Sequence, residues 1–381
     1  MYKNYKSMFM LDPKITYLNH GSFGACPKIV FESLINWQKV LEKNPLQHLG
    51  FDIYKYLENS RNHLGTYINC NKDDLVFSPN PSTALNTVIK SLKLNSNDEI
   101  LTTNHEYGAL DKSWNFICKK TGAKYRKQNI SLPLLSKEKF LDEFCKGFNE
   151  KTKIIFISHI TSATGLIFPI EEICDFAKQK NILCIIDGAH VPGHINLNIK
   201  KLNPDIYVGA CHKWMCTPKG VSFLYVKKEL QNMIDPLVVS WGYEAEKPSH
   251  SKFLDYHQWQ GTNDVSAYLT MPDVIKFLNK NNWTDVSTKC KKDTIIARDM
   301  ILKFLNTRPI SNHKFLGQMS SMEISYKNPE LLCKKLAEDY NIHIPAFNWN
   351  NKIMLRISMQ AYNSLEDIDK LIFALKNIIK Q

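Results

Sequence analysis

A lysine placed among apolar and aromatic residues is the feature of this sequence that most clearly indicates a chemical reaction. Lys213 follows the apolar run 204–210, which predicts a short buried strand, and its neighbours include Cys211, His212 and Trp214. Burial penalises the charged form of an amine and lowers its pKa, and the neutral amine can then condense with an aldehyde. The alternative, for Lys213 considered alone, is a lysine that extends from a strand end to solvent.

A carboxylate occupies the corresponding place one strand earlier. Residues 183–186 are apolar, as is typical of a parallel strand buried on both faces, and Asp187 follows at the end where open α/β sheets bind ligands. A buried carboxylate needs a cationic partner, and a protonated pyridine nitrogen is one. Asp187 and Lys213 are therefore the pair that a pyridoxal 5'-phosphate (PLP) enzyme needs: a lysine for the Schiff base and an aspartate that keeps the ring nitrogen protonated.

Seven stretches of the sequence carry a resemblance to a known family. They are LDPKITYLNHGSFGACP at 11–27, FISHITSATGLIFP at 156–169, IDGAHVPG at 186–193, GACHKWMCTPKG at 209–220, VSWGYE at 239–244, QGTND at 260–264 and LRIS at 355–358. In this order they resemble the class V aminotransferase family of fold-type I PLP enzymes, and within it the isopenicillin N epimerase-like members. The resemblance is specific for the cofactor but leaves the reaction open, because epimerases, C–S lyases, desulfurases and transaminases share this scaffold.

The expected architecture combines a large and a small domain. The β-α-β alternation from 99 to 226 predicts an α/β fold with a mostly parallel sheet. The resemblance implies the fold-type I PLP-dependent transferase form of it, with a mostly parallel seven-stranded sheet and a smaller C-terminal α+β domain. We expect an N-terminal arm over 1–14, a large PLP-binding domain over 15–266 and the small domain over 267–381, where helical stretches alternate with short strands.

The segment after the predicted strand 75–77 has the composition of a phosphate-binding helix start. Pro81 stands near the start of a helix, with Ser82 and Thr83 beside it. Free amides and the helix dipole at such an end bind phosphate, while plain capping by Ser82 or Thr83 is the alternative. The resemblance implies that this turn cradles the cofactor phosphate, with Asn80, Ser82 and Thr83 as cofactor-binding residues.

The resemblance assigns further residues to the cofactor. Tyr107, just beyond a predicted strand, would lie against the pyridine face, with a partly buried structural tyrosine as the alternative. His190 would lie beside the cofactor's 3-hydroxyl. The other cofactor-binding residues that it implies are Ser158, Thr161, His212 and Thr262, together with Asp187 and Lys213.

One position departs from the family pattern, and another implies a second subunit. Ala210 stands where the family often has a serine that contributes to phosphate binding, so we expect one hydroxyl fewer there, with His212 retained. Gly261 and Thr262 match the family segment that reaches the phosphate of the neighbouring subunit's cofactor. The resemblance therefore implies a homodimer with active sites shared between subunits.

An arginine on an apolar strand predicts how the substrate is held. Arg356 lies between Leu355 and Ile357, where an unpaired guanidinium is costly. A structural salt bridge would satisfy it, but a bidentate contact with the carboxylate of an amino-acid substrate is the reading that the resemblance implies. The resemblance adds three substrate-binding residues at the mouth of the site, Asn19, His20 and Gly21, although His20 alone would be read as an ordinary turn residue.

The expected activity is therefore that of a PLP enzyme acting at Cα of an amino acid through an external aldimine, with Lys213 as the base and Asp187 supporting the ring. We favour a C–S lyase that performs β-elimination on a cysteine-type substrate. The alternatives are an amino-acid epimerase and a class V aminotransferase. A desulfurase that forms a persulfide needs a mobile cysteine, and the nearest candidate, Cys333, lies in an apolar-periodic helix and is expected in the core.

An activity of another class, a metal-dependent hydrolase, would use Asp187, His190 and His194, since one carboxylate and two histidines can bind a metal. Pro192 and Gly193 break the helix that would align them, so we expect no metal.

The amino-acid composition indicates which kinds of binding partner and which cellular compartment to expect. Lys and Arg together number 49 against 37 for Asp and Glu, but they are spread along the chain, so we expect no nucleic-acid partner. The ten cysteines show no metal-binding or disulfide spacing, which favours a reducing compartment, and we expect a cytoplasmic protein. No window approaches the ~18 apolar residues of a membrane span, so we expect no membrane association.

Overall fold

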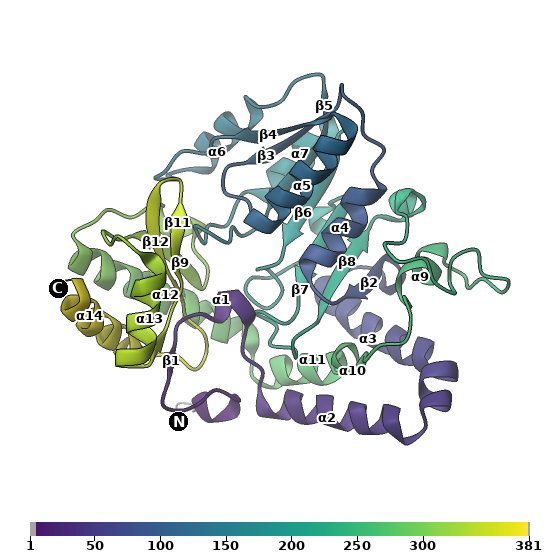
Figure 1. Cartoon of the computed structure of the whole chain (residues 1–381), viewed down its shortest axis with the longest axis horizontal. Coiled ribbons are helices and arrows are strands. Elements are labelled where there is room, and N and C mark those ends of the chain that lie inside the picture. Colours follow the sequence, from purple (N-terminus) through teal and green to yellow (C-terminus); the bar gives the residue numbers. More distant parts are fainter. Residues whose placement is uncertain (1–4, 380–381) are drawn as a thin grey trace.

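The computed structural model describes residues 5–379, and a seven-stranded sheet forms its centre (Figure 1). The strands are β2 (Leu75–Ser78), β3 (Glu99–Thr103), β4 (Lys124–Gln128), β5 (Thr152–Ser158), β6 (Leu183–Gly188), β7 (Ile206–Ala210) and β8 (Ser222–Val226), in the spatial order β2-β8-β7-β6-β5-β3-β4. All neighbours are parallel except the two pairs that β8 makes. The predicted α/β fold with a mostly parallel seven-stranded sheet is confirmed.

Helices cover both faces of this sheet. Their bounds are α2 (Lys28–Lys43), α3 (Ile53–Ile68), α4 (Pro81–Ser91), α5 (Gly108–Thr121), α6 (Lys137–Cys145), α7 (Ile170–Gln179), α8 (Ile199–Leu202) and α9 (Lys252–His257). Ile154 and Phe156 of β5 belong to the core under α4 and α5, whereas Ile155 and Ile157 belong to the core that includes α3 and α7. Because side chains alternate along a strand, burial on both faces explains the uninterrupted apolar runs.

The register of the sheet brings the segments that contain the predicted site residues to one side of the sheet, where the parallel strands end. Ala210 at the end of β7 pairs with Ser222, which pairs with Ser78 at the end of β2. Ser158 at the end of β5 pairs with Asp187 on β6. The carboxyl ends of parallel strands meet at the same edge, so the loops that follow β2, β5, β6 and β7 lie close together there.

The C-terminal part forms a second block of structure beside the sheet (Figure 1). It contains α12 (Trp283–Leu305), β9 (Met319–Glu323), α13 (Pro329–Tyr340), β10 (Ile342–His343), β11 (Ala346–Trp349), β12 (Lys352–Ser358) and α14 (Leu365–Ile379). Strands β11, β12 and β9 form an antiparallel sheet in that order, and apolar residues of α12, α13 and α14 pack against it in a separate core.

Two segments bear on where the two parts divide. The strand β1 (Thr16–Tyr17) pairs with β10, and Leu18 lies in the C-terminal core. Helices α10 (Ser266–Leu269) and α11 (Met271–Lys280) pack on α2 and α3. The boundaries at 14/15 and 266/267 stay predictions. Residues 1–4 of the predicted arm and 380–381 of the predicted small domain lie outside the described residues.

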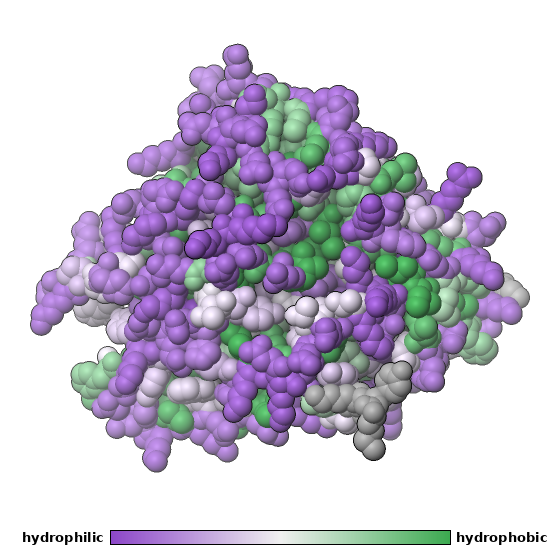
Figure 2. All heavy atoms as spheres, turned by 180° about the vertical axis from the view of Figure 1, so that it is seen from behind, coloured by the Kyte–Doolittle hydropathy of each residue, from purple (hydrophilic) through white to green (hydrophobic). Residues whose placement is uncertain are grey.

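The surface is mostly hydrophilic with local apolar areas. Figure 2 shows such areas near the middle and at one side of the face opposite to that of Figure 1. Within residues 5–379, no helix is both long enough and apolar enough to cross a membrane.

Candidate active site

Lys213 lies just beyond β7, at the edge where the strand ends converge. Its side chain is half-buried, and its Nζ lies 3.2 Å from His190 Nε2. Burial lowers the pKa of the Lys213 amine to about 8, the Asp187 carboxylate acts in the opposite direction, and the Arg356 guanidinium lowers it further. A substantial fraction of this amine is therefore neutral near pH 8, as a nucleophile or base requires.

Asp187 is buried on the neighbouring strand β6. Its Oδ1 accepts the backbone N–H of Ala189 at 2.9 Å. Burial raises the pKa of the Asp187 carboxyl, while the Ala189 N–H and the Lys213 charge act to lower it. A carboxylate and an amine on adjacent strand ends are thus held in a poorly hydrated edge, which is the pair that the sequence predicted.

Arg356 on β12 is buried without a carboxylate. Its exposed fraction is 4%, and it donates from Nη1 to the Ser162 backbone oxygen at 2.6 Å and from Nη2 to Ser22 Oγ at 2.8 Å. The Nε atom has no hydrogen-bond partner among the described residues, and no carboxylate there acts on its charge. Burial lowers the pKa of Arg356 to about 10. A buried guanidinium in this state can bind an anion as a further partner.

The three predicted substrate contacts at the N-terminus lie in different surroundings, around the short helix α1 (His20–Phe23). Asn19 accepts from the Ser22 hydroxyl, which itself accepts from Arg356. His20 is fully buried, with Nδ1 2.9 Å from the Tyr362 hydroxyl and Nε2 2.9 Å from the Lys213 carbonyl. Gly21 donates its N–H to a hydroxyl of β12. Asn19 is therefore linked to Arg356 through one hydroxyl, whereas His20 supports the backbone of Lys213.

The start of α4 has the predicted form, with a different capping residue. The Asn80 side chain, and not that of Ser82 or Thr83, is the N-cap: it accepts the Thr83 N–H at 2.9 Å. Ser82 and Thr83 stay partly exposed at this helix end. Thr262 is exposed, and its neighbour Asn263 borders the same small hollow as Thr83. The positive end of the α4 dipole therefore faces open space beside the 260–263 loop.

Two of the predicted cofactor residues already have partners within the fold. Ser158 donates its N–H and its hydroxyl to Glu106, a buried carboxylate that the sequence analysis missed. Burial raises the pKa of Glu106 to about 8, and the hydrogen bonds from Ser158 and Thr103 oppose that rise. Thr161 shares a hydrogen bond of 2.7 Å with Thr164 inside its own turn. Ser158 and Thr161 thus shape the edge beside Asp187. A carboxylate next to the strand end was the signal that could have identified Glu106.

Tyr107 has a partly exposed ring, and His212 has a ring nitrogen that can accept a hydrogen bond. Tyr107 is the N-cap residue of α5 and is 48% exposed. His212 Nδ1 lies 2.7 Å from the Val221 carbonyl, so Nδ1 carries the hydrogen and Nε2 stays available. Burial lowers the pKa of His212 to about 4.

His190 and His194, the histidines of the alternative metal site, form hydrogen bonds within the protein. His194 Nδ1 lies 3.0 Å from the His190 carbonyl, and its Nε2 accepts the Gln318 N–H. His190 contacts Lys213 and the indole of Trp214, another residue whose part in the site the sequence did not reveal. In the described part of the chain, no three His, Cys, Asp or Glu side chains are grouped as a metal site. Both ring nitrogens of His190 and of His194 are therefore engaged in contacts within the protein.

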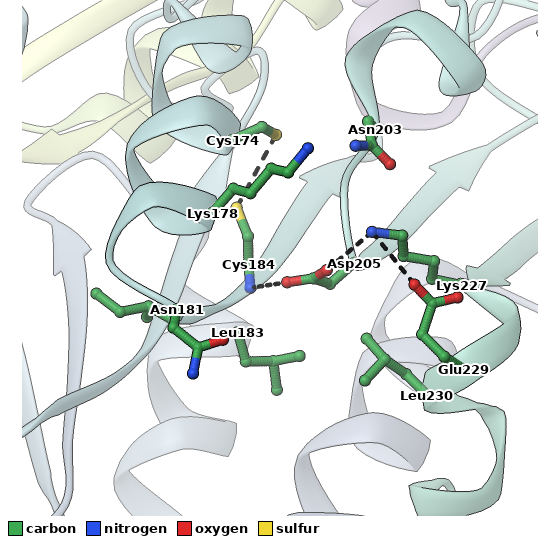
Figure 3. Close-up of a pocket in the computed structure, with 11 residues that line it drawn as sticks. Cys174, Lys178, Asn181, Leu183, Cys184, Asn203, Asp205, Lys227, Glu229 and Leu230 are labelled. Atoms are coloured by element: carbon green, nitrogen blue, oxygen red, sulfur yellow. Dashed lines mark hydrogen bonds and ion pairs between the residues drawn. The ribbon is translucent and has the colours of Figure 1, made fainter.

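A second hollow lies at the opposite edge of the sheet, near the amino ends of β6 and β7 (Figure 3). There Asp205 accepts the Cys184 N–H at 2.9 Å and pairs with Lys227, and the Cys174 and Cys184 sulfurs lie 4.0 Å apart. None of the predicted site residues borders it. Because none of the predicted residues lies there, the candidate active site is placed at the carboxyl ends of the strands.

Comparison with known proteins identifies the family. The Aminotransferase class-V family profile matches residues 25–371. The chain belongs to this family. It is 27% identical to isopenicillin N epimerase of Amycolatopsis lactamdurans, with 99% of this chain and 98% of that protein aligned. It is 26% identical to hercynylcysteine sulfoxide lyase of Schizosaccharomyces pombe, over 96% and 94% of the two chains. It is 24% identical to a probable chloroplastic L-cysteine desulfhydrase of Arabidopsis thaliana, over 97% and 84%.

Solved structures show the same fold. The cystine C–S lyase C-DES, bound to its product cysteine persulfide, superimposes with a TM-score of 0.83 at 20% identity, over 95% of this chain and 97% of the other. The cysteine desulfurase CsdA of Escherichia coli gives 0.81 at 18% identity, over 99% and 98%. The fold-type I assignment made from the sequence is confirmed, and so is membership of a PLP-dependent enzyme family.

The residues present fit PLP. A half-buried amine and a buried carboxylate lie on adjacent strand ends, as needed for the aldehyde and for the ring nitrogen of this cofactor. The start of α4, with its dipole and the partly exposed Ser82 and Thr83, suits a phosphate. PLP is the cofactor of this family member, and the chain is an enzyme.

We predict that Lys213 titrates near pH 8 in the cofactor-free protein, well below an exposed lysine. Asp187→Asn should lower the pKa of Lys213 further, because it removes the negative charge that stabilises the ammonium form. The measurement is the pH dependence of Lys213 acylation by an amine reagent, read by peptide mass spectrometry.

Asp205→Asn, at the opposite edge of the same sheet, is the matched control and should leave the Lys213 profile unchanged. A Lys213 midpoint near 10.5 in the parent protein would contradict the buried-amine assignment.

Proposed function

We propose that this protein is a PLP-dependent C–S lyase that cleaves the Cβ–S bond of a cysteine-type amino acid. The observation that carries the proposal is the buried Arg356 of β12, whose guanidinium has no carboxylate partner among the described residues and whose charge acts on Lys213. A planar guanidinium binds a carboxylate through two parallel hydrogen bonds, so an α-amino acid fits this arrangement. Several relatives carry the names of enzymes that act on cysteine or on a cysteine derivative, which supports the sulfur-bearing substrate.

The chain's residues divide the work. Arg356 binds the α-carboxylate and fixes the direction of the Cα–H bond. Lys213 takes the α-proton at Nζ, and Asp187 holds a positive charge on the ring nitrogen. When bound, PLP supplies the aldehyde and the electron-withdrawing ring that make this proton acidic. The β-sulfur group would leave with the electron pair of the Cβ–S bond and take up a proton, and the remaining three-carbon enamine would react with water to give pyruvate and ammonia.

The rest of the cofactor site is part of the same proposal. We assign the phosphate to the start of α4, with Asn80, Ser82 and Thr83, and to His212, whose Nε2 is available. Tyr107 would cover the ring, and His190 would lie beside its hydroxyl group. Ser158 and Thr161 would shape the cofactor site through their hydrogen bonds with Glu106 and Thr164.

An epimerase is the second candidate. The alignment with isopenicillin N epimerase runs over nearly the whole of both chains, which favours it. A desulfurase is less supported, because Cys333 is tied into the small domain: its sulfur accepts the Ala346 N–H at 3.1 Å, and burial raises the pKa of its thiol. A thiol in that state is a poor nucleophile.

We also propose a homodimer with shared active sites. Several large apolar side chains are exposed on the single chain, among them Phe23 next to the site and Trp241, which is 88% exposed. A second subunit would cover them, and Thr262 would then reach the partner's cofactor phosphate. The cytoplasmic location remains a proposal that rests on cysteine usage.

The lyase proposal predicts that the PLP-loaded protein releases pyruvate and ammonia from cysteine, a cysteine S-conjugate or a cysteine sulfoxide. The measurement is a pyruvate assay over a substrate panel, run in D2O with the residual substrate examined for deuterium at Cα and for inversion. Lys213→Ala is the inactive control. Deuterium incorporation with inversion and no pyruvate would replace the lyase by the epimerase.

Arg356→Lys should reduce kcat/KM for amino acids by roughly 30-fold to 700-fold, since the loss of one charge-assisted contact costs about 2–4 kcal/mol. Cofactor content should not change. The matched control is Arg298→Lys, a buried arginine that pairs with Asp299 away from the site. Equal use of carboxylate and carboxamide substrates by the Arg356→Lys protein would show that Arg356 has a structural role instead.

A mixed-dimer test addresses shared sites. If Thr262 acts across the dimer, then mixing inactive Thr262→Ala and Lys213→Ala proteins yields dimers in which one site carries both changes and the other carries neither. Activity should therefore return on subunit exchange. If exchange is demonstrated by mass spectrometry and activity stays absent, Thr262 serves its own subunit.

A further inference from the structure

Three side chains form a directed hydrogen-bond chain that ends at the Lys213 amine. Trp214 Nε1 donates to His190 Nδ1 at 3.3 Å, and His190 Nε2 lies 3.2 Å from Lys213 Nζ. Trp214 is fully buried and His190 nearly so, so water does not compete for the contact between these two rings.

The direction of this chain follows from the indole. An indole N–H can only donate, so His190 Nδ1 must present its lone pair. Burial and the nearby Lys213 charge hold the pKa of His190 well below its ordinary value, so the ring is neutral and carries one proton. That proton must sit on Nε2, the atom that faces Lys213. A neutral imidazole N–H there donates to the lone pair of a neutral amine and opposes an ammonium group.

We propose that Trp214 is a positioning residue that fixes His190 as the Nε2–H tautomer, so that His190 donates a hydrogen bond toward the Lys213 amine and favours its neutral form. The inference deepens the proposed function, because it rests on Lys213 as the reacting amine.

Packing holds the indole in place for this task. The Trp214 ring lies between His20 and His194, with ring centroids 4.9 and 4.1 Å away. Gly193 has φ +81°, and a Cβ built there would lie 2.4 Å from the Trp214 carbonyl group, so only glycine allows this approach. His194 is itself oriented, since Gln318 N–H donates to its Nε2 and its Nδ1 then donates to the His190 carbonyl.

Other charges act on the same amine and stay in place when the indole is changed. Asp187 raises the pKa of Lys213 and Arg356 lowers it, while His20 and His194 face His190. Replacing Trp214 by Phe keeps all four groups and a flat ring but removes the N–H. His190 can then move its proton to Nδ1 and offer its Nε2 lone pair to an ammonium group.

The chain offers matched controls for this substitution. Trp283 and Trp114 are also buried, and their Nε1 atoms have no hydrogen-bond partner among the described residues. Trp283→Phe and Trp114→Phe therefore remove the same volume from a core without removing a hydrogen bond, and should leave Lys213 unaffected.

The first measurement reads the tautomer directly. The parent protein is labelled with ring-¹⁵N histidine, its His190 signals are assigned by their loss in His190→Asn, and the spectra are recorded with and without PLP. We expect the Nε2–H tautomer in the cofactor-free protein. A proton on Nδ1, or on both nitrogens, would overturn the inference, and this result does not depend on whether Trp214→Phe folds.

The second measurement is the pH profile of Lys213 acylation in cofactor-free Trp214→Phe and in the two controls. We expect the midpoint of Trp214→Phe to rise by about one pH unit, so that Lys213 reacts about tenfold more slowly below the midpoint. A profile that coincides with that of Trp283→Phe would overturn the inference. Because neither measurement uses a substrate, a protein that failed as a C–S lyase would still give a clear answer here.

Discussion

The burial of one amine beside one carboxylate, at the edge where parallel strands end, is the constraint on which the rest of this structure depends. Asp187 lies on β6 and Lys213 just beyond the end of the neighbouring strand β7, so the sheet brings both to the same side, and the surrounding atoms set their affinity for protons. Burial acts on the two groups in opposite senses, lowering one pKa and raising the other. The neutral form of each group is thereby favoured. The free-energy cost of burying these polar groups must be offset by the hydrophobic cores on both faces of the sheet.

A site of this kind needs hydrogen bonds that have one direction only. Donor-only groups provide it: the Trp214 indole toward His190, the Gln318 backbone N–H toward His194, and the Ser158 backbone N–H toward Glu106. Because a buried polar group without a partner is costly, these contacts fix protonation states as well as positions. Contacts within the protein therefore orient the side chains at the carboxyl ends of the strands.

The sequence predicted the central strands because burial on both faces makes them apolar throughout, and the pair Asp187 and Lys213 because each is the polar exception at a strand end. It did not indicate β4, an edge strand with few apolar residues, which Arg126 and Tyr125 secure through Glu99 and Asp111. The capping role of Asn80 and the direction of His190 also could not be predicted. The capping role of Asn80 is a choice among similar residues within one turn. The direction of the His190 hydrogen bonds depends on contacts between segments that are distant in the sequence.

Arg356 shows how stability and function are balanced here. A buried guanidinium with an unpartnered Nε is a defect by the rules of folding, and the chain contains a better solution in Arg298, which pairs with Asp299. Local rules of this kind are expected to fail where a binding partner comes from outside the chain. Arg356 has no carboxylate partner among the described residues, and Lys213 offers a half-buried amine. The aldehyde of PLP would react with the amine, and an α-amino acid would supply the carboxylate. The two defects are therefore better explained together, as one binding site, than as separate imperfections of the core.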